Sequence, residues 1–256
     1  MITLLSPSKT LNEKPNLITK EYSIPEFLNK SAELVGILKE YNPASLGKLM
    51  DINPKLSNIN LERYLKWRLP FDTTNAERAV LMFKGEVFNG LKAESLNEEN
   101  LLFAQEHVRI LSGLYGVLKP LDLIQPYRLE MGTNLKHNGW NDLYQFWGEQ
   151  LTEKLNEEIE NHKVKTILNL ASDEYFKSIQ IEGLKAKILK CQFKEERDGQ
   201  LKFVTIYGKK ARGMMTRFIL ENQIDTEEDL KAFDIDGYHY NPEHSTDDFF
   251  MFSRES

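Results

Sequence analysis

The spacing of apolar residues predicts helices through the first two thirds of the chain. Apolar side chains recur three and four residues apart, which places them on one face of a helix. The stretches with this spacing are 25–50, 51–71, 76–91, 98–111 and 143–161. Asn42-Pro43 interrupts the first stretch and Lys84-Gly85 interrupts the third. We therefore expect several helices separated by short breaks.

Apolar runs of strand length predict strands at the start of the chain and again in its last third. These runs are 2–5, 165–171, 186–193, 201–207 and 249–252. The runs 186–193 and 201–207 flank the turn 195–199, which is typical of an antiparallel hairpin. The chain shows no internal repeat and no low-complexity linker. Since helices come early and strands late, we predict one α+β domain over 1–256, with a mixed sheet and surrounding helices.

The composition is that of an ordinary globular protein, with 41% hydrophobic and 28% charged residues. No apolar run approaches the roughly 18 residues that a membrane span needs. Residues 1–9 carry no basic region ahead of their apolar positions, so they do not indicate a signal peptide. We therefore expect a cytoplasmic protein.

Cysteine and histidine usage argues against a bound metal. Cys191 is the only cysteine, which excludes an internal disulfide and a thiolate-rich metal site. It lies in a strand pattern, so we expect a buried apolar side chain rather than a redox sensor. Among the histidines, only two are close enough in sequence to suggest a metal site, and their spacing fits no standard one. These are His239 and His244, with Glu243 and Asp247 nearby. We predict no metal and no cofactor.

The charge is distributed unevenly along the chain, although the net charge is −6. Residues 221–256 hold eleven acidic residues against Lys231 and Arg254, a charge of −9 that leaves +3 on residues 1–220. The stretch 201–220 contains five cations and no acidic residue. Asymmetry of this kind bears on binding partners more than the total charge does.

The stretch 209–222 predicts an amphipathic helix with a basic face. Its apolar stripe is Ala211, Met214, Met215, Phe218 and Ile219, and its cations are Lys209, Lys210, Arg212 and Arg217. Three of these cations would fall in the first turn, where the helix dipole is already positive. A bound anion would offset that repulsion, so the pattern indicates an anion site. A solvated basic face is the alternative.

The stretch 109–132 has no clear helical or strand period, and its glycines and prolines disfavour regular structure. It is therefore a candidate functional segment. Leu111-Ser-Gly-Leu-Tyr-Gly116 partly resembles the glycine hairpin of helix–hairpin–helix DNA-binding motifs, although its glycines are three apart rather than two. Ser112, Gly113, Tyr115 and Gly116 would then meet a phosphate. Arg109, Lys119 and Arg128 would extend a phosphate track. The alternative is a glycine-lined turn packed against the sheet.

Two strand ends carry polar groups suited to a ligand. In Asn169-Leu-Ala-Ser-Asp-Glu-Tyr175 a strand runs into a helix start, where Ser172 or Asp173 can cap the helix. Alternatively, Glu174 lies in a pocket with Lys9 or Lys84 as an acid–base or orienting group. Ser6-Pro-Ser-Lys9 could present hydroxyls and an amine. It lacks the glycines of a P-loop, so nucleoside triphosphate hydrolysis is not supported.

The chain resembles the YaaA family of bacterial peroxide-stress proteins through ordered motifs along nearly its whole length. The motifs are Ser6–Leu11, Phe83–Val87, Leu111–Asp122, Gln125–Gly132, Asp142–Gly148, Asn169–Lys177 and Lys209–Gly213. The resemblance implies a cytoplasmic protein made under hydrogen peroxide stress, which limits damage by lowering free iron. It also implies an unusual α+β fold with a positively charged cleft and a helix–hairpin–helix-like element that binds DNA.

Two functions are therefore expected. The first is binding of DNA, as a duplex, bubble or junction, with one side of the cleft formed by Lys209, Lys210, Arg212 and Arg217. The Ser112–Gly116 hairpin, with its neighbouring cations, would form the other side. The second is an enzyme acting on a nucleotide-like or other anionic small molecule, with Lys9, Lys84, Glu174 and Lys209 as candidate catalytic groups.

Overall fold

A mixed sheet forms the centre of the computed structural model, which describes residues 1–15 and 18–255. Its strands follow the order β11-β12-β9-β8-β1-β5-β6, and β10 pairs with β9. Their bounds are β1 (Ile2–Leu5), β5 (Val108–Ser112), β6 (Gly116–Leu118), β8 (Thr166–Asn169), β9 (Lys187–Arg197), β10 (Gln200–Lys202), β11 (His239–Tyr240) and β12 (Phe249–Glu255). The predicted mixed sheet is confirmed.

Strands β5, β1, β8, β9 and β12 run parallel, so their carboxyl ends share one edge of the sheet. Every residue of β1 and β8 is buried, which explains why both sequences are nearly unbroken apolar runs. Parallel strands need long crossovers, and helices supply them here. The architecture is therefore α/β, and the predicted α+β class is wrong in this respect.

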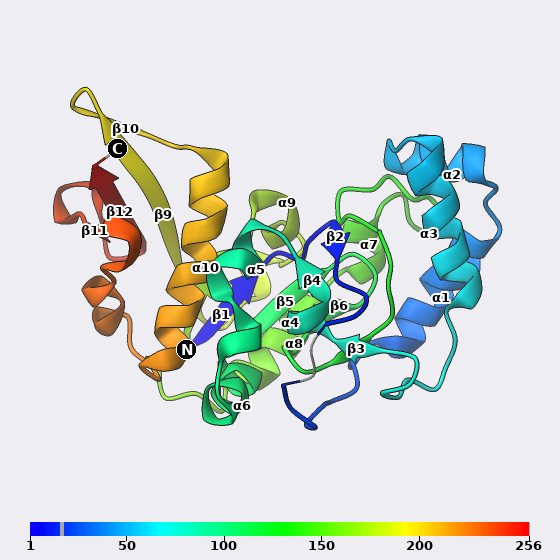
Figure 1. Cartoon of the computed structure of the whole chain (residues 1–256), viewed down its shortest axis with the longest axis horizontal. Helices are drawn as coiled ribbons and strands as arrows, with labels where there is room; N and C mark the ends of the chain where they lie inside the picture. The colour runs from blue at the N-terminus through cyan, green and yellow to red at the C-terminus, as the bar shows by residue number, and fades with distance from the viewer. Residues whose placement is uncertain (16–17, 256) are drawn as a thin grey trace.

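Helices and two small strand pairs surround the sheet (Figure 1). The helices are α1 (Leu28–Lys39), α2 (Pro43–Met50), α3 (Pro54–Lys66), α4 (Ala79–Met82), α5 (Glu86–Leu91), α6 (Glu98–His107), α7 (Leu143–Trp147), α8 (Gln150–Ile159), α9 (Asp173–Phe176) and α10 (Thr205–Glu221). The pairs are β2 (Thr10–Leu11) with β4 (Phe83–Lys84), and β3 (Glu77–Arg78) with β7 (Leu123–Ile124). None of the described helices is long and apolar enough to cross a membrane.

Two arms rise on either side of the middle of the molecule (Figure 1). Helices α1, α2 and α3 form one arm, and Asn42 and Asn53 cap α2 and α3 just ahead of a proline at the first helical position. The β9–β10 hairpin and the start of α10 form the other arm. Helix α9 and strand β2 lie between the arms, next to the carboxyl end of β1.

Helices α5 and α10 approach each other closely because glycines face each other across the contact. A Cβ atom built on Gly213 would lie 1.8 Å from the carbonyl oxygen of Val87, and one on Gly90 would lie 2.1 Å from the carbonyl oxygen of Lys210. No side chain fits in such a space, so these two positions require glycine.

Three element predictions are wrong at their boundaries. Helix α10 begins at Thr205, so 201–207 is not one strand. Helix α6 ends at His107, and the next five residues form β5 between β1 and β6. The predicted break at Lys84-Gly85 separates α4 from α5, but the stretch 76–91 also contains strands β3 and β4, which were not predicted. In each case packing against distant segments overrides the local pattern.

Candidate functional site

The polar groups at the carboxyl end of the sheet form the candidate site. The chain connects β1 to β5 on one side and reaches β8 on the other, so β1 marks the point where the strand order switches direction. Ligands of open α/β sheets bind in the crevice at such a point. Residues 6–9 leave β1 there, and residues 172–175 follow β8.

Two serines join these loops. The amide of Ser172 donates to Ser6 Oγ at 2.9 Å, and the two hydroxyl oxygens lie 3.2 Å apart. Ser172 occupies the N-cap position of α9 as predicted, but its side chain makes no capping hydrogen bond. Its hydroxyl therefore faces the loop after β1 instead of closing the helix. Both side chains are half-buried, so a ligand can reach them.

The carboxylate that pairs with Lys9 is Glu130, and the sequence analysis did not identify it. Lys9 and Arg128 both form ion pairs with Glu130, the second at 2.9 Å. Glu174 instead accepts a hydrogen bond from the Gly132 amide at 3.0 Å. The predicted pairing of Glu174 with Lys9 is therefore wrong, since the 128–132 segment lies between them and supplies both partners.

Lys9, Arg128 and Glu130 line a small pocket together with two buried tyrosines, Tyr127 and Tyr175. Burial raises the pKa of both phenols, so they stay protonated at neutral pH. The pocket therefore offers neutral hydroxyls beside a carboxylate and two cations.

Arg212 approaches the site from α10, where its charge interacts with Asp173, and the exposed Lys209 lies three residues before it on the same helix. Arg212 is half-buried, and burial lowers the pKa of its guanidinium while the charge of Asp173 opposes that shift. Within residues 1–15 and 18–255, no carboxylate lies at ion-pair distance from Arg212, whereas Lys210 pairs with Asp236 at 3.7 Å. Since α10 begins at Thr205, Lys209 lies in its second turn, and the predicted anion site at the helix N-terminus is wrong.

Lys84 is an exposed cation beside the same loop. Ser8 donates its hydroxyl to the Lys84 carbonyl, which holds β4 against the residues that follow β1. No carboxylate of the described residues pairs with the Lys84 ammonium, so the predicted contact with Glu174 does not form.

The structure places the predicted phosphate-binding hairpin inside the protein. Strands rather than helices flank its turn, so the helix–hairpin–helix-like prediction is wrong for this segment. Ser112, Gly113, Tyr115 and Gly116 are all buried. Trp147 donates its indole N–H to the Gly113 carbonyl at 3.1 Å, and a Cβ on Gly116 would meet the Trp147 ring. Gly116 thus makes room for the Trp147 ring and Gly113 for the backbone of Leu129, and the alternative of a packed turn is confirmed.

Two more predicted cations, Arg109 and Arg217, have partners within the protein, and Lys119 lies in a separate pocket. Arg109 is 2% exposed and its Nε donates to Glu158 at 2.6 Å. Arg217 donates to the Leu91 and Lys92 carbonyls at the end of α5 and pairs with Glu221. Lys119 is half-buried in a separate pocket that Arg109 and Glu158 also line. The contacts of Arg109 and Arg217 are structural, and Arg217 and Lys119 both keep some access to solvent.

Cys191 is buried, as predicted, with 6% of its surface exposed. Burial raises the pKa of its thiol, which suppresses the reactive thiolate. We expect Cys191 to remain unmodified when the folded protein is incubated with a thiol-reactive disulfide reagent, and to react at once in denaturant. Absorbance of the released thiolate measures both rates. Rapid modification of the folded protein would contradict this prediction.

Comparisons with known proteins agree on one family. The family model described as "Peroxide stress protein YaaA" matches residues 1–244. A relative from Shewanella amazonensis, described as "UPF0246 protein", is 46% identical over 255 residues, which cover 100% of this chain and 99% of that protein.

Proposed function

Because the chain belongs to the peroxide stress protein YaaA family, we propose that it acts in the response to hydrogen peroxide by binding DNA in the cytoplasm. The expected ligands are structured or distorted duplexes, bound between the two arms. Binding there would help limit iron-dependent oxidative damage. The support for this proposal comes from the charges at the carboxyl end of the sheet.

Arg212 carries the argument. A half-buried cation without an ion pair costs free energy, because burial removes hydration that no carboxylate replaces. A phosphate group would offset that cost, since the planar guanidinium fork matches its oxygens in two parallel hydrogen bonds. Lys209 and Lys84 are exposed and would extend the contact to neighbouring phosphates.

Exposed aromatic side chains support a preference for distorted DNA. Phe203 and Tyr207 are 46% and 40% exposed, and they lie where β10 leads into α10. The guanidinium of Arg254 lies 4.9 Å from the Tyr207 ring centre. Exposed aromatic rings beside cations bind unpaired bases by stacking. A bubble or junction offers such bases, whereas an intact duplex does not.

The test is fluorescence anisotropy with duplex, bubble and four-way-junction DNA, at about 50 and 200 mM salt. We expect the double variant Lys84→Ala/Lys209→Ala to bind all three ligands about tenfold more weakly, since each lost surface contact contributes about 0.7 kcal/mol. Its plot of log affinity against log salt should flatten by about 2, because two phosphate contacts are removed.

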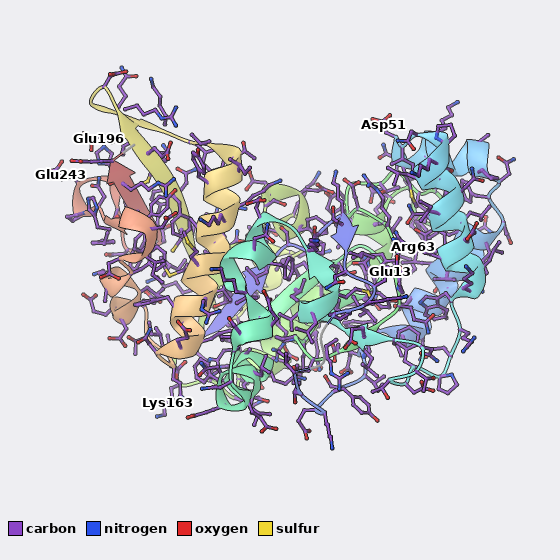
Figure 2. All side chains as sticks on the ribbon, viewed as in Figure 1. Glu13, Asp51, Arg63, Lys163, Glu196 and Glu243 are labelled. Carbon is purple, nitrogen blue, oxygen red and sulfur yellow. The ribbon has the colours of Figure 1, made fainter. Side chains whose placement is uncertain are left out.

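Lys163→Ala is the matched control. Lys163 is exposed like the two test lysines but lies at the far end of the molecule from the arms (Figure 2). Its replacement should leave affinity and salt dependence unchanged. Equal losses in the control and the double variant would show that the contact is not at this site.

An enzyme acting on an anionic small molecule is the second candidate. The groups around the loops after β1 and β8 support it, because hydroxyls, a carboxylate and cations gather there. The recess beside Lys9 and Glu130 has a volume of only about 10 Å³, so a ligand would lie over it rather than inside it. Weak binding of all three DNA ligands at low salt would favour this candidate. Nucleotide-dependent increases in melting temperature, lost in Arg212→Gln, would then identify the ligand.

A further inference from the structure

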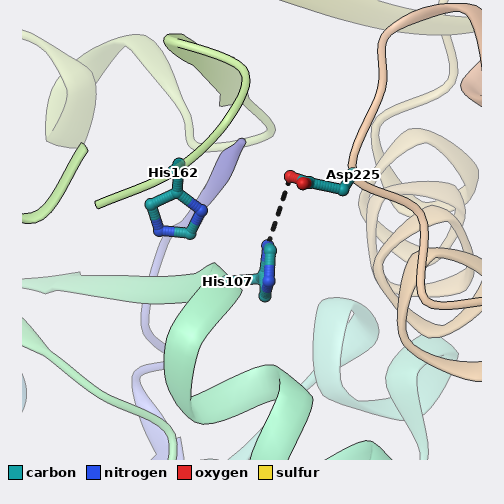
Figure 3. Close-up of side chains that lie close together, drawn as sticks. All are labelled: His107, His162 and Asp225. Carbon is teal, nitrogen blue, oxygen red and sulfur yellow. Dashed lines mark ion pairs between the residues drawn. The ribbon is translucent and has the colours of Figure 1, made fainter. Parts of the chain in front are cut away.

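The opposite edge of the sheet carries a cluster of metal-ligand types outside the candidate site. His107 ends α6, His162 lies in the turn between α8 and β8, and Asp225 follows α10 (Figure 3). One potential ligand atom from each residue lies within 4.8 Å of the other two, and all three residues are half-buried. The sequence analysis missed the cluster because more than fifty residues separate each member from the next.

Neighbouring groups hold the His107 imidazole and the turn that carries His162. The His107 ring stacks on Phe103 with 3.9 Å between ring centres, and its Nδ1 lies 2.9 Å from the Met1 carbonyl oxygen. The turn that carries His162 is held by Lys165, whose Nζ donates to three carbonyls of residues 159–162. Ligands that are fixed in this way lose little freedom when an ion binds.

A positively charged group already lies at the cluster. The Met1 ammonium forms an ion pair with Asp225 at 2.7 Å and lies 3.2 Å from Nδ1 of His162. The cluster therefore already attracts a cation, and a bound metal ion would displace the ammonium from Asp225.

We propose that His107, His162 and Asp225 bind one divalent first-row transition-metal ion, with Zn²⁺ as the representative case. Two imidazoles and one carboxylate are a characteristic zinc ligand set, and three protein ligands leave one coordination position open. Magnesium and calcium prefer oxygen ligands, so they would bind weakly.

The ligand atoms must move closer together for an ion to bind. Two ligand atoms that each lie about 2.1 Å from a tetrahedral ion are about 3.4 Å apart. The atoms here lie within 4.8 Å of one another, so binding would draw them together by up to about 1.4 Å. A bound ion would tie α6, the turn before β8 and the segment after α10 together, and would stabilise the folded state by mass action.

The experiment is calorimetric titration of the full chain with ZnCl₂ after chelator treatment, with any purification tag at the carboxyl end. We expect one ion per chain and a rise in melting temperature. His107→Gln/His162→Gln should bind at least about 100-fold more weakly and lose the rise. The control is His239→Gln/His244→Gln, which removes two exposed histidines that do not belong to the cluster and should change affinity less than twofold.

A second variant and a second metal test the proposal even if the histidine double variant does not fold. If the double variant does not fold, Asp225→Asn replaces it, and the Co²⁺ absorption spectrum of the unaltered protein reports the coordination directly. Tetrahedral bands that Zn²⁺ displaces, and that Asp225→Asn alters, would support the proposal. Retention of stoichiometric Zn²⁺ binding in the histidine double variant would overturn it, as would the absence of binding to the unaltered protein at micromolar Zn²⁺.

Discussion

Replacing Gly213 by alanine is expected to lower the free energy of unfolding by at least about 2 kcal/mol, although alanine favours a helix. The added Cβ would lie 1.8 Å from the Val87 carbonyl oxygen and 2.8 Å from the Leu91 amide nitrogen. Both atoms belong to the backbone of α5, so no side-chain rotation relieves the overlap. The two helices must separate, and the buried apolar residues along their contact lose packing.

Gly36→Ala makes the same chemical change in α1, where nothing lies within 4 Å of the new Cβ. We expect this variant to be more stable by about 0.5–1 kcal/mol, because alanine loses less backbone entropy on folding. Urea denaturation measures the free energy of unfolding of both variants. Similar unfolding free energies for the two variants would contradict the close contact between α5 and α10.

Replacing Arg109 by methionine is the second large effect, and we expect it to cost about 3–5 kcal/mol of stability. The side chain is almost fully buried, and its ion pair with Glu158 is the main compensation for its charge. Its Nη1 also donates to the Gln105 and Val108 carbonyls at 2.8 and 2.6 Å. The variant leaves two carbonyls without their partner, and it leaves the half-buried Glu158 carboxylate with the more distant Lys154 ammonium, 3.8 Å away.

The double variant Arg109→Met/Glu158→Met should recover most of the lost stability, since apolar side chains of similar volume often replace a buried ion pair at little cost. Thermal and urea unfolding measure the recovery. The double variant also tests the sequence-based assignment of Arg109 to a phosphate track. Unchanged DNA affinity would confirm a purely structural role, and a uniform loss of affinity in a variant of restored stability would return Arg109 to the binding surface.

Local sequence patterns predicted most elements well. Ile2–Leu5 and Thr166–Asn169 are strands within the predicted runs, because an apolar segment of that length fits the centre of a parallel sheet. Helices α2 and α3 start where an asparagine precedes a proline. These signals act over a few residues, so the sequence displays them without knowledge of the fold.

The failures lie where distant segments compete with local preference. Thr205-Ile-Tyr207 has strand-forming side chains, yet it is the first turn of α10, which packs along α5 through Gly90 and Gly213. Val108–Ser112 continues a helical pattern, yet it pairs with β1 and β6. The energy of forming the sheet and burying these side chains exceeds the small difference in propensity.

The amino-acid sequence therefore establishes the family, the kind of the longer elements, the burial of Cys191 and the concentration of acidic residues after residue 220. Whether a cation is free or paired is settled by the fold: Arg109 meets Glu158 and Lys9 meets Glu130, while Arg212 has no carboxylate partner among the described residues. The fold also brings His107, His162 and Asp225 close enough together to form one cluster. Ion pairing and metal coordination depend on distances of a few ångströms between segments far apart in the chain, and residue periodicity carries no information about those distances.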